Sequence, residues 1–377
     1  MRVALGHDYL TQRGGAERVV QVMAHAYPDA PVYTTLYDPD GTFPEVGSLD
    51  VRPSRLNGIS ALRRHHRLAM PVLAPVVSRM KIDAEVLLVS SSGWAHGMQS
   101  TGRKIVYCHA PARWLYQRDR YLGAPEKQAS GLGAHLRRDL AAGALAVLGS
   151  GLRRWDREAA HSADRYLVNS TVVREAVRTA YGIEADVLPP PPALLPAGEE
   201  SPVAGIEPGF VLCVARLLPY KNVDVVLAAV EQVPGVRLVV VGEGPERAAL
   251  TDRAARSGRV HIAGRVTDAE LRWLYRSCAA LATASYEDYG LAPLEAAAFG
   301  RPACTLRDGG FLDTVVDGRT GVFFDRPEPD SVAAGLERLL ASVWDADMIR
   351  DHARSFSAER FIGRIRDVVG QEHALSG

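Results

Sequence analysis

Between residues 285 and 300 the chain reads Ser285-Tyr-Glu-Asp-Tyr-Gly-Leu-Ala-Pro-Leu-Glu-Ala-Ala-Ala-Phe-Gly300. Two carboxylates, Glu287 and Glu295, lie eight positions apart in this stretch. Glu287 falls in a glycine-containing loop just after an apolar, strand-like run at 279–283. Glu295 falls in the first turn of a short helix, for which Pro293 is a favourable first residue. A glutamate in a first helical turn complements the helix dipole, so capping alone is one explanation of Glu295.

The surroundings of these carboxylates indicate a ligand as well. A second glycine turn, Gly309-Gly310, follows the next apolar run. Free N–H groups at a helix N-terminus suit a phosphate, and an ionised carboxylate accepts hydrogen bonds from two neighbouring hydroxyls. A phosphate together with several hydroxyls describes a sugar nucleotide, so the stretch predicts a site for one.

The pair Glu287-x7-Glu295, with Gly290, Pro293 and Gly300, resembles the E-x7-E signature of retaining glycosyltransferases of family 4. The sequence of this stretch is most similar to the O-antigen-type, GDP-mannose-dependent mannosyltransferase branch. That family has the GT-B fold. The resemblance therefore implies an α/β chain of two Rossmann-like domains, with parallel sheets facing across a cleft.

Length and composition agree with two domains. The chain has 377 residues, of which 47% are hydrophobic and 23% charged, and a domain usually takes about 100–200 residues. No run approaches the roughly 18 apolar residues that span a bilayer. We expect a cytoplasmic protein, with peripheral contact at the inner face of the plasma membrane as an open alternative. The four cysteines lack the C-x2-C spacing of zinc and redox sites, and we expect no metal.

The beginning of the chain predicts a strand, a glycine turn and a helix in that order. An apolar run at 3–6 is followed by Gly14-Gly15 and then by apolar residues at helical spacing. The turn lacks the G-x-G-x-x-G pattern of nicotinamide-binding proteins. The family resemblance implies that the backbone of Gly14 and Gly15 meets the donor diphosphate. A tight strand–helix turn without a ligand is the alternative.

Positive charge is concentrated in the first half. Residues 1–190 contain 24 Lys and Arg against 18 Asp and Glu, although the whole chain is neutral. The segment 59–81 mixes basic and apolar residues in a helical pattern interrupted at Pro71 and Pro75, and a second, arginine-rich helical pattern covers 127–165. A basic and apolar helix suits an anionic membrane surface. A solvated charged face over an ordinary core is the alternative.

A further strand, 104–109, ends in His109, at the edge where open parallel sheets place ligands. The residues from Tyr107 to Arg113 resemble the Tyr-Cys-His-x-Pro-x-Arg motif of the mannosyltransferase branch. The resemblance implies that His109 contacts the donor sugar and is catalytic, and that Arg113 contacts the acceptor or a phosphate. A structural histidine is the alternative.

The second half repeats the alternation of strand and helix after the proline run 189–192, which predicts a linker. We expect domains at 1–190 and 191–354 and a C-terminal helix, 355–377, that packs back on the first domain. Arg216 and Lys221 flank a proline turn after a strand at 209–215. Burying a diphosphate requires compensating cations or a metal.

The resemblance assigns several roles in this half. Arg216 and Lys221 match the Arg-x4-Lys that binds donor phosphates in the family, and an exposed pair is the alternative. Glu287 joins His109 as a catalytic residue. The remaining residues form the donor site: the phosphate contact Leu291, the ribose ligand Glu295, and the turn Gly264, Arg265 and Val266 at the base.

The predicted function is a retaining glycosyltransferase that moves mannose from GDP-mannose to a hydroxyl of a glycan or lipid-linked saccharide in cell-surface polysaccharide biosynthesis. It would need no cofactor besides the nucleotide-sugar donor and would bind no nucleic acid. Three alternatives stay open: another sugar donor with a small-molecule acceptor, a sugar-nucleotide epimerase or hydrolase of the same fold, and a non-catalytic carbohydrate-binding protein.

Overall fold

The computed structural model describes residues 1–117 and 149–375 and divides the chain into two compact units. The first unit contains Met1–Pro190 and Ala358–Gly377, and the second contains Pro191–Ser357. The division falls inside the proline run 189–192, whose residues cannot donate to a sheet ladder. Of the predicted helix at 127–165, residues 149–161 are helical, and the part before residue 149 lies outside the described residues.

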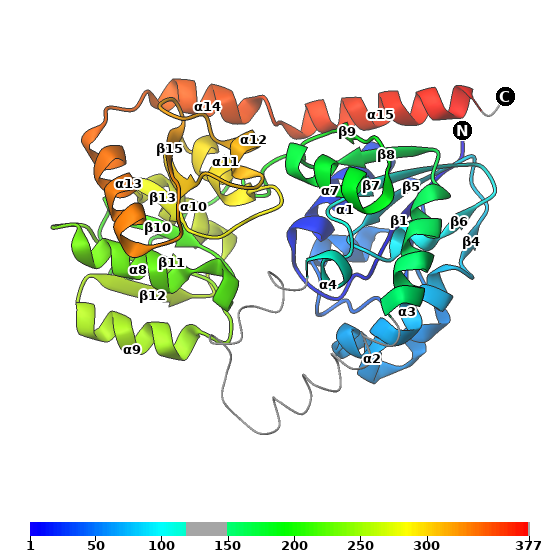
Figure 1. Cartoon of the computed structure of the whole chain (residues 1–377), viewed down its shortest axis with the longest axis horizontal. Coiled ribbons are helices and arrows are strands. Elements are labelled where there is room, and N and C mark those ends of the chain that lie inside the picture. Colours follow the sequence, from blue (N-terminus) through cyan, green and yellow to red (C-terminus); the bar gives the residue numbers. More distant parts are fainter. Residues whose placement is uncertain (118–148, 376–377) are drawn as a thin grey trace. The chain divides into compact units, whose positions relative to one another are not determined.

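The first unit contains a seven-stranded parallel sheet in the order β3-β2-β1-β5-β7-β8-β9 (Figure 1). Its strands are β1 (Val3–His7), β2 (Val32–Thr34), β3 (Val51–Pro53), β5 (Val86–Ser91), β7 (Arg103–Cys108), β8 (Arg165–Val168) and β9 (Asp186–Val187), while β4 (Lys81–Ile82) and β6 (Gln99–Ser100) pair separately. The α-helices are α1 (Gly15–Ala26), α2 (Ser60–Arg64), α3 (Met70–Val77), α4 (Arg113–Tyr116), α7 (Thr171–Tyr181) and α15 (Ala358–Ala374). The 3-10 helices are η1 (Pro44–Ser48), η2 (Arg55–Gly58), η3 (His66–Ala69) and η4 (Ala95–Gly97).

The two faces of this sheet bury different cores because side chains alternate along a strand. Leu88 of β5 and Tyr107 of β7 pack with α1 and α15 on one face. Their neighbours Val89 and Cys108 pack with α3 and α7 on the other face. This alternation decides which polar residues meet at the strand ends.

The predicted helix over 59–81 is broken into α2, η3 and α3. Pro71 occupies the second position of α3, where a missing N–H is tolerated, and Pro75 lies inside the same helix. His65 ends α2 with a non-helical backbone. The basic residues around 63–67 therefore lie on short helical pieces rather than on one continuous helix.

The second unit contains a six-stranded parallel sheet in the order β12-β11-β10-β13-β14-β15. Its strands are β10 (Val211–Val214), β11 (Leu238–Val241), β12 (Val260–Gly264), β13 (Ala280–Thr283), β14 (Ala303–Leu306) and β15 (Gly321–Phe324). Its helices are η6 (Pro219–Lys221), α8 (Val223–Gln232), α9 (Arg247–Ser257), α10 (Asp268–Ser277), α11 (Leu291–Ala298), α12 (Phe311–Thr314), α13 (Pro329–Ala341) and α14 (Ala346–Arg354).

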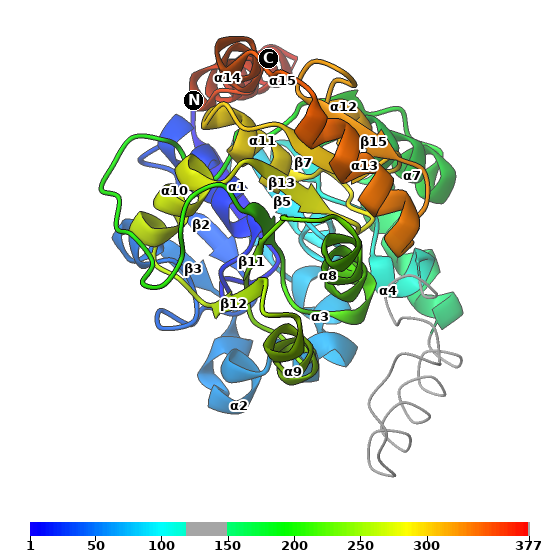
Figure 2. The ribbon, with the colours of Figure 1, turned by 90° about the vertical axis from the view of Figure 1, so that its left-hand side faces the viewer.

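Helices cover both faces of this second sheet. Figure 2 shows α8 and α13 on one side of it and α10 and α11 on the other, and α8 packs directly against α13. Right-handed crossovers between parallel strands produce this arrangement. Both units are therefore Rossmann-like, which confirms the expected fold class of two α/β domains with parallel sheets.

The described residues also settle two smaller points. All four cysteines are buried and none is part of a disulfide, as their positions in apolar runs indicate. Of the helices in the ranges 1–117 and 149–375, none combines the length and hydropathy needed to cross a bilayer.

The packing of α15 on α1 predicts a large stability effect for Ile365, which is fully buried in the first unit. We expect Ile365→Ala to lower the free energy of unfolding by about 2–5 kcal/mol, because it removes buried methyl groups and leaves a cavity. Differential scanning calorimetry would show a lower Tm for the transition of the first unit.

The control is Arg364→Ala, one position away on the exposed side of the same helix. This substitution should change stability by about 0.5 kcal/mol at most. Equal Tm values for the two variants would contradict the packing of α15.

Candidate functional site

In the second unit, three loops meet tightly at the carboxyl ends of β10, β11 and β12. Gly242 has a φ of +142°, and a Cβ at this position would lie 1.9 Å from the carbonyl oxygen of Ala215. A Cβ at Gly244 would lie 2.2 Å from the carbonyl oxygen of Leu217. Both positions therefore require glycine, and their close packing fixes the loop that carries Arg216 and Lys221.

Lys221 and Glu287 form an ion pair between the loop after β10 and the loop after β13. The hydroxyl of Ser285 donates to the same Glu287 oxygen at 2.7 Å. Asn222 follows Lys221 in the left-handed conformation, with φ +51°, and its side-chain amide donates to the carbonyl of Ala284 at 3.0 Å. The predicted phosphate ligand and the predicted catalytic carboxylate thus lie side by side.

The glycine turn after β14 supports the backbone of Glu287. Gly310 donates its N–H to the carbonyl of Glu287 at 2.8 Å. A Cβ at Gly309, whose φ is +65°, would lie 2.3 Å from the same carbonyl oxygen. Leu291 is the first residue of α11 and follows Gly290, whose φ is +92°. The N-terminus of α11 therefore lies beside the loop of Glu287.

Arg216 is exposed, its carbonyl accepts from the N–H of Leu218 at 2.8 Å, and its side chain forms no hydrogen bond or ion pair within the described ranges. The turn at Gly264, Arg265 and Val266 follows β12, and the backbone N–H of Arg265 donates to the carboxylate of Glu243 at 3.2 Å. These residues occupy the same carboxyl edge of the sheet as Lys221, because every strand pair is parallel. Parallel α/β sheets bind ligands at this edge.

The prediction that Glu295 lies in the first turn of its helix is wrong. Helix α11 begins at Leu291, two residues before Pro293, so that Glu295 lies in the second turn. Its buried carboxylate accepts a hydrogen bond from the hydroxyl of Tyr275 at 2.7 Å. Helix capping therefore does not explain Glu295, and Tyr275 holds its carboxylate.

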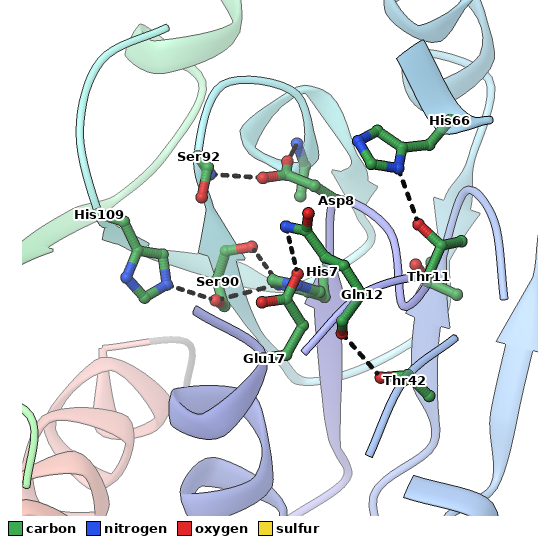
Figure 3. A network of polar contacts seen from close by, with 12 residues as sticks. His7, Asp8, Thr11, Gln12, Glu17, Thr42, His66, Ser90, Ser92 and His109 are labelled. Carbon is green, nitrogen blue, oxygen red and sulfur yellow. Dashed lines mark hydrogen bonds and ion pairs between the residues drawn. The ribbon is translucent and has the colours of Figure 1, made fainter. Parts of the chain in front are cut away.

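In the first unit, three polar side chains meet at the ends of neighbouring strands. His7 of β1 is paired in register with Ser90 of β5, and the N–H of His109, just after β7, donates to the carbonyl of Ser91 at 2.8 Å. The Ser90 hydroxyl lies 2.8 Å from Nε2 of His109 and 3.1 Å from Nδ1 of His7. Figure 3 shows Ser90 between the two imidazole rings.

The predicted phosphate turn Gly14-Gly15 also holds a carboxylate. Glu17 lies in the first turn of α1 and is 1% exposed, and its Oε2 is 2.6 Å from the position of a Cβ on Gly14. Its Oε1 accepts from the side-chain amide of Gln12 at 3.0 Å and lies 3.8 Å from Nε2 of His7. A carboxylate in the first turn complements the helix dipole, and the imidazole of His7 faces it.

The two histidines have opposite pKa shifts. Burial lowers the pKa of His109 to about 3, and the charges of His7 and Arg113 act in the same direction. Burial also opposes the charged form of His7, but the hydrogen bond and charge of Glu17, the charge of Asp8 and the carbonyl of Ser90 together raise its pKa. The surroundings of the two imidazoles therefore move their pKa values apart.

A second buried network fixes the loop after β5. The carboxylate of Asp8 accepts from the backbone N–H groups of Trp94 and Ala95 at 3.0 and 2.6 Å. On the opposite face from Ser90, the hydroxyl of Ser91 contacts Nδ1 of His96 at 2.9 Å, and Nε2 of His96 lies 3.0 Å from Asp156. These groups are all buried and hold the loop in place.

Sequence reasoning did not single out Ser90, His7 or Glu17 as site residues. The signal was available in part, because His7 and Ser90 are the polar ends of apolar runs, and such ends gather at one edge of a parallel sheet. The pairing of β1 with β5 and of β5 with β7 was needed to bring them to His109. Among residues 1–117 and 149–375, no cluster of three His, Cys, Asp or Glu is placed to hold a metal ion.

Comparison with known proteins finds relatives for part of the chain. Residues 199–356, most of the second unit, match the family of glycosyl transferases group 1. Over 154 residues the chain is 30% identical to glycogen synthase 1 of Bradyrhizobium diazoefficiens, covering 39% of this chain and 33% of that protein. Over 152 residues it is 34% identical to D-inositol 3-phosphate glycosyltransferase of Segniliparus rotundus, covering 37% and 34%. The alignments thus span about a third of these curated relatives.

Solved structures extend the likeness of the fold to the whole chain. The crystal structure of Anabaena Alr3699/HepE in complex with UDP and glucose has a TM-score of 0.69, covers 98% of this chain and 99% of its own, and is 18% identical. Sucrose-phosphate synthase from Thermosynechococcus elongatus has the same TM-score, full coverage of both chains and 16% identity. These likenesses show the shared two-domain fold.

The lowered pKa of His109 predicts a pH dependence of stability. Between the unfolded pKa of about 6.5 and the folded value, the unfolded chain binds a proton that the folded chain does not, so stability falls as the pH falls. Between pH 7.5 and pH 5 this loss is about 2 kcal/mol for a folded pKa near 3. We expect His109→Gln to lose less Tm over this range than the wild type.

The control for this experiment is His261→Gln, which alters an exposed histidine of β12 in the second unit. Its loss of Tm between pH 7.5 and pH 5 should match that of the wild type. An equal loss for His109→Gln and the wild type would show that His109 takes up a proton as readily in the folded chain as in the unfolded one.

Proposed function

We propose that this protein is a glycosyltransferase that moves a sugar from a nucleoside diphosphate sugar to a hydroxyl group. The observation that carries the proposal is the Lys221–Glu287 pair, which lies at the carboxyl edge of a parallel sheet in the segment matched to glycosyl transferases group 1. A cation, a carboxylate and the N-terminus of α11 lie together there. These are the groups that bind a diphosphate and sugar hydroxyls.

The chemistry assigned to the second unit is electrostatic. As the bond between the sugar and the diphosphate breaks, negative charge grows on the leaving phosphate. Lys221, Arg216 and backbone N–H groups, including that of Leu291, would stabilise this charge, and fixed donors of this kind supply the largest single contribution in many enzymes. Glu295 and the turn Gly264–Val266 would hold the ribose and the base.

We propose further that the reaction retains the configuration of the sugar. The acceptor hydroxyl would attack from the face that the diphosphate leaves, and the diphosphate would take its proton. As the resemblance implies, His109 and Glu287 would hold the sugar, Gly14 and Gly15 would meet the diphosphate, and Arg113 would contact the acceptor or a phosphate. No metal is required in this scheme, because Arg216 and Lys221 supply the positive charge.

The identity of the donor is the finer part of the proposal. The motif around His109 favours GDP-mannose, whereas the relatives named above are a glycogen synthase and a D-inositol 3-phosphate glycosyltransferase, and the solved relative named above contains UDP and glucose. GDP-mannose and UDP-glucose are therefore the two donors to test first. The acceptor class is a glycan or a lipid-linked saccharide.

A donor panel tests the proposal. We would measure the Tm of the protein with GDP, UDP, ADP and their sugars, and then incubate the best donor with and without saccharide acceptors. A rise in Tm with one preferred nucleotide and a product formed only with acceptor would support it. Donor consumption without acceptor would indicate an epimerase or hydrolase. Binding of a saccharide without turnover, and without any nucleotide response, would favour a carbohydrate-binding protein.

The phosphate role of Lys221 gives a direct prediction. Lys221→Ala should lower kcat/KM by about 100- to 1,000-fold, because it removes a fixed donor from the leaving group. Steady-state kinetics with the preferred donor would measure this. Lys221→Arg keeps the charge and should retain more activity.

Arg237→Ala is the matched control, because it removes an exposed cation outside these loops. Arg237 forms an ion pair with Glu207, with 3.3 Å between the charged groups. Its kcat/KM should stay close to that of the wild type. An unchanged kcat/KM in Lys221→Ala would remove Lys221 from the mechanism.

We propose that the first unit contacts an anionic membrane through the segment 59–77. Its apolar residues Ile59, Leu68 and Val72 are 52%, 62% and 41% exposed, and they lie among the basic residues Arg63 and Arg64. Each cation near anionic headgroups contributes about 1 kcal/mol, and exposed apolar side chains add to it. Peripheral contact at the inner face of the plasma membrane would bring the site to a lipid-linked acceptor.

Vesicle flotation tests this surface. The protein should float with vesicles of phosphatidylcholine and phosphatidylglycerol and remain behind with phosphatidylcholine alone, because the attraction is electrostatic. Leu68→Glu should abolish flotation. Val343→Glu, which alters a fully exposed apolar residue of the second unit, should leave it intact, and equal flotation of both variants would overturn the assignment.

A further inference from the structure

The Ser90 hydroxyl joins two histidines whose protons can be ordered from geometry alone. Nδ1 of His7 lies 3.2 Å from the carbonyl oxygen of Ser90 and 3.1 Å from its hydroxyl oxygen. A carbonyl oxygen can only accept a hydrogen bond. An unprotonated Nδ1 of His7 would set its lone pair against this carbonyl oxygen, so the geometry favours a protonated Nδ1 that donates toward Ser90.

The order of the next hydrogen bond follows. Since Nδ1 of His7 is a donor, the Ser90 hydroxyl accepts from it and has its own proton to donate elsewhere. The neighbouring acceptor is Nε2 of His109, at 2.8 Å. Nε2 of His109 is then unprotonated, and a neutral imidazole in this state carries its proton on Nδ1.

The contact of the other ring nitrogen of His7, Nε2, supports the same placement of the protons. Its Nε2 faces the buried Glu17 carboxylate at 3.8 Å, and the other contact of this Glu17 oxygen is the side-chain amide of Gln12. A buried carboxylate needs a compensating charge or donors, so a proton on Nε2 of His7 is favoured as well. Figure 3 shows Gln12, Glu17, His7, Ser90 and His109 as one connected series.

Three further contacts hold His109 in place. Its backbone N–H donates to Ser91, its carbonyl accepts from the side-chain amide of Asn169 at 3.2 Å, and its ring lies edge-on to Tyr107. Nδ1 of His109 makes no hydrogen bond to any residue of the ranges 1–117 and 149–375, and the ring is only partly buried. Its Nδ1–H is the polar group of this series that is left for a ligand.

We infer that Ser90, His7 and Glu17 are positioning residues that fix His109 as the neutral tautomer protonated at Nδ1, so that this N–H donates to a sugar hydroxyl oxygen. The inference rests on the proposed function for the identity of the ligand. The proton order itself rests only on contacts within the first unit. A His109 free to carry its proton on Nε2 would present an acceptor to the sugar in place of a donor.

The direct test is nuclear magnetic resonance of protein labelled with ¹⁵N-histidine. The signals of His109 are assigned by their absence in His109→Gln. At pH 7 we expect the wild-type ring to be neutral, with a protonated Nδ1 and an unprotonated Nε2. A proton on Nε2, or a charged ring, would overturn the inference without any need for a folded Ser90 variant.

Ser90→Ala tests the role of the hydroxyl. Loss of this donor should end the preference for Nδ1–H in His109, and kcat/KM should fall about tenfold, as expected for one hydrogen bond. Binding of the nucleoside diphosphate should be unchanged, because Ser90 does not contact the residues assigned to the phosphates. Ser90→Thr keeps the hydroxyl and should restore the tautomer.

Ser91→Ala is a matched control on the next residue of the same strand. Both serines are buried and both contact a buried or partly buried histidine, but Ser91 faces the opposite side of the sheet and contacts His96. The two alanine variants should lose similar Tm, while only Ser90→Ala changes the tautomer of His109. A retained Nδ1–H tautomer in Ser90→Ala would overturn the inference.

The outcomes separate this inference from the proposed function. The tautomer is measured without donor or acceptor, so a protein that transfers no sugar can still show the predicted proton order. In that case the glycosyltransferase proposal fails while the positioning of His109 stands. Transfer that is unaffected by Ser90→Ala, despite a changed tautomer, would show that the reaction does not use the Nδ1–H of His109.

Discussion

In both sheets every strand pair of the described residues is parallel, and this constraint determines where polar groups gather. Parallel strands need crossover helices, which cover both faces and make the strands apolar along their length. Polar residues are then excluded from the middle of the strands and appear at their carboxyl ends, as His7, Ser90 and His109 do in the first unit. The candidate site residues are consequences of this topology.

The cost of burying charge explains much of the geometry at these ends. Asp8, Glu17 and Glu295 are buried carboxylates and Glu287 is a partly buried one, and each meets a different partner. Backbone N–H groups donate to Asp8, the Tyr275 hydroxyl donates to Glu295, the imidazole of His7 faces Glu17, and the ammonium group of Lys221 pairs with Glu287. Since an unpaired buried charge is strongly unfavourable, these partners also fix the loops that carry them.

The Lys221–Glu287 pair has a particular consequence for ligand binding. A diphosphate bound by Lys221 would compete with Glu287 for the same ammonium group. This group has three N–H donors to divide between the two anions. If Lys221 turned to a phosphate, Glu287 would retain the Ser285 hydroxyl as a donor. The carboxylate is therefore not left without a partner, and it can accept hydrogen bonds from sugar hydroxyls.

How much the sequence predicts depends on how local the signal is. Strands, glycine turns and the proline run are determined by neighbouring residues in the sequence, so the two α/β units and the turn at Gly309-Gly310 could be predicted. The start of α11 could not, because Gly290 in a left-handed conformation begins the helix before Pro293 does. The Ser90 network was missed because it depends on which strands pair, and nothing local encodes the neighbours of β5.

Ser90 and Ser91 show why this pairing matters for function. The two residues are adjacent and chemically identical, and each contacts a histidine that faces a carboxylate. Alternation along the strand sends Ser91 to the face where His96 is 3% exposed, so that its network is sealed within the core. Ser90 points to the face of α1, where His109 remains partly open at the strand end. The same set of groups therefore stabilises a loop on one face and, in the proposed function, orders the protons of His109 for a ligand on the other.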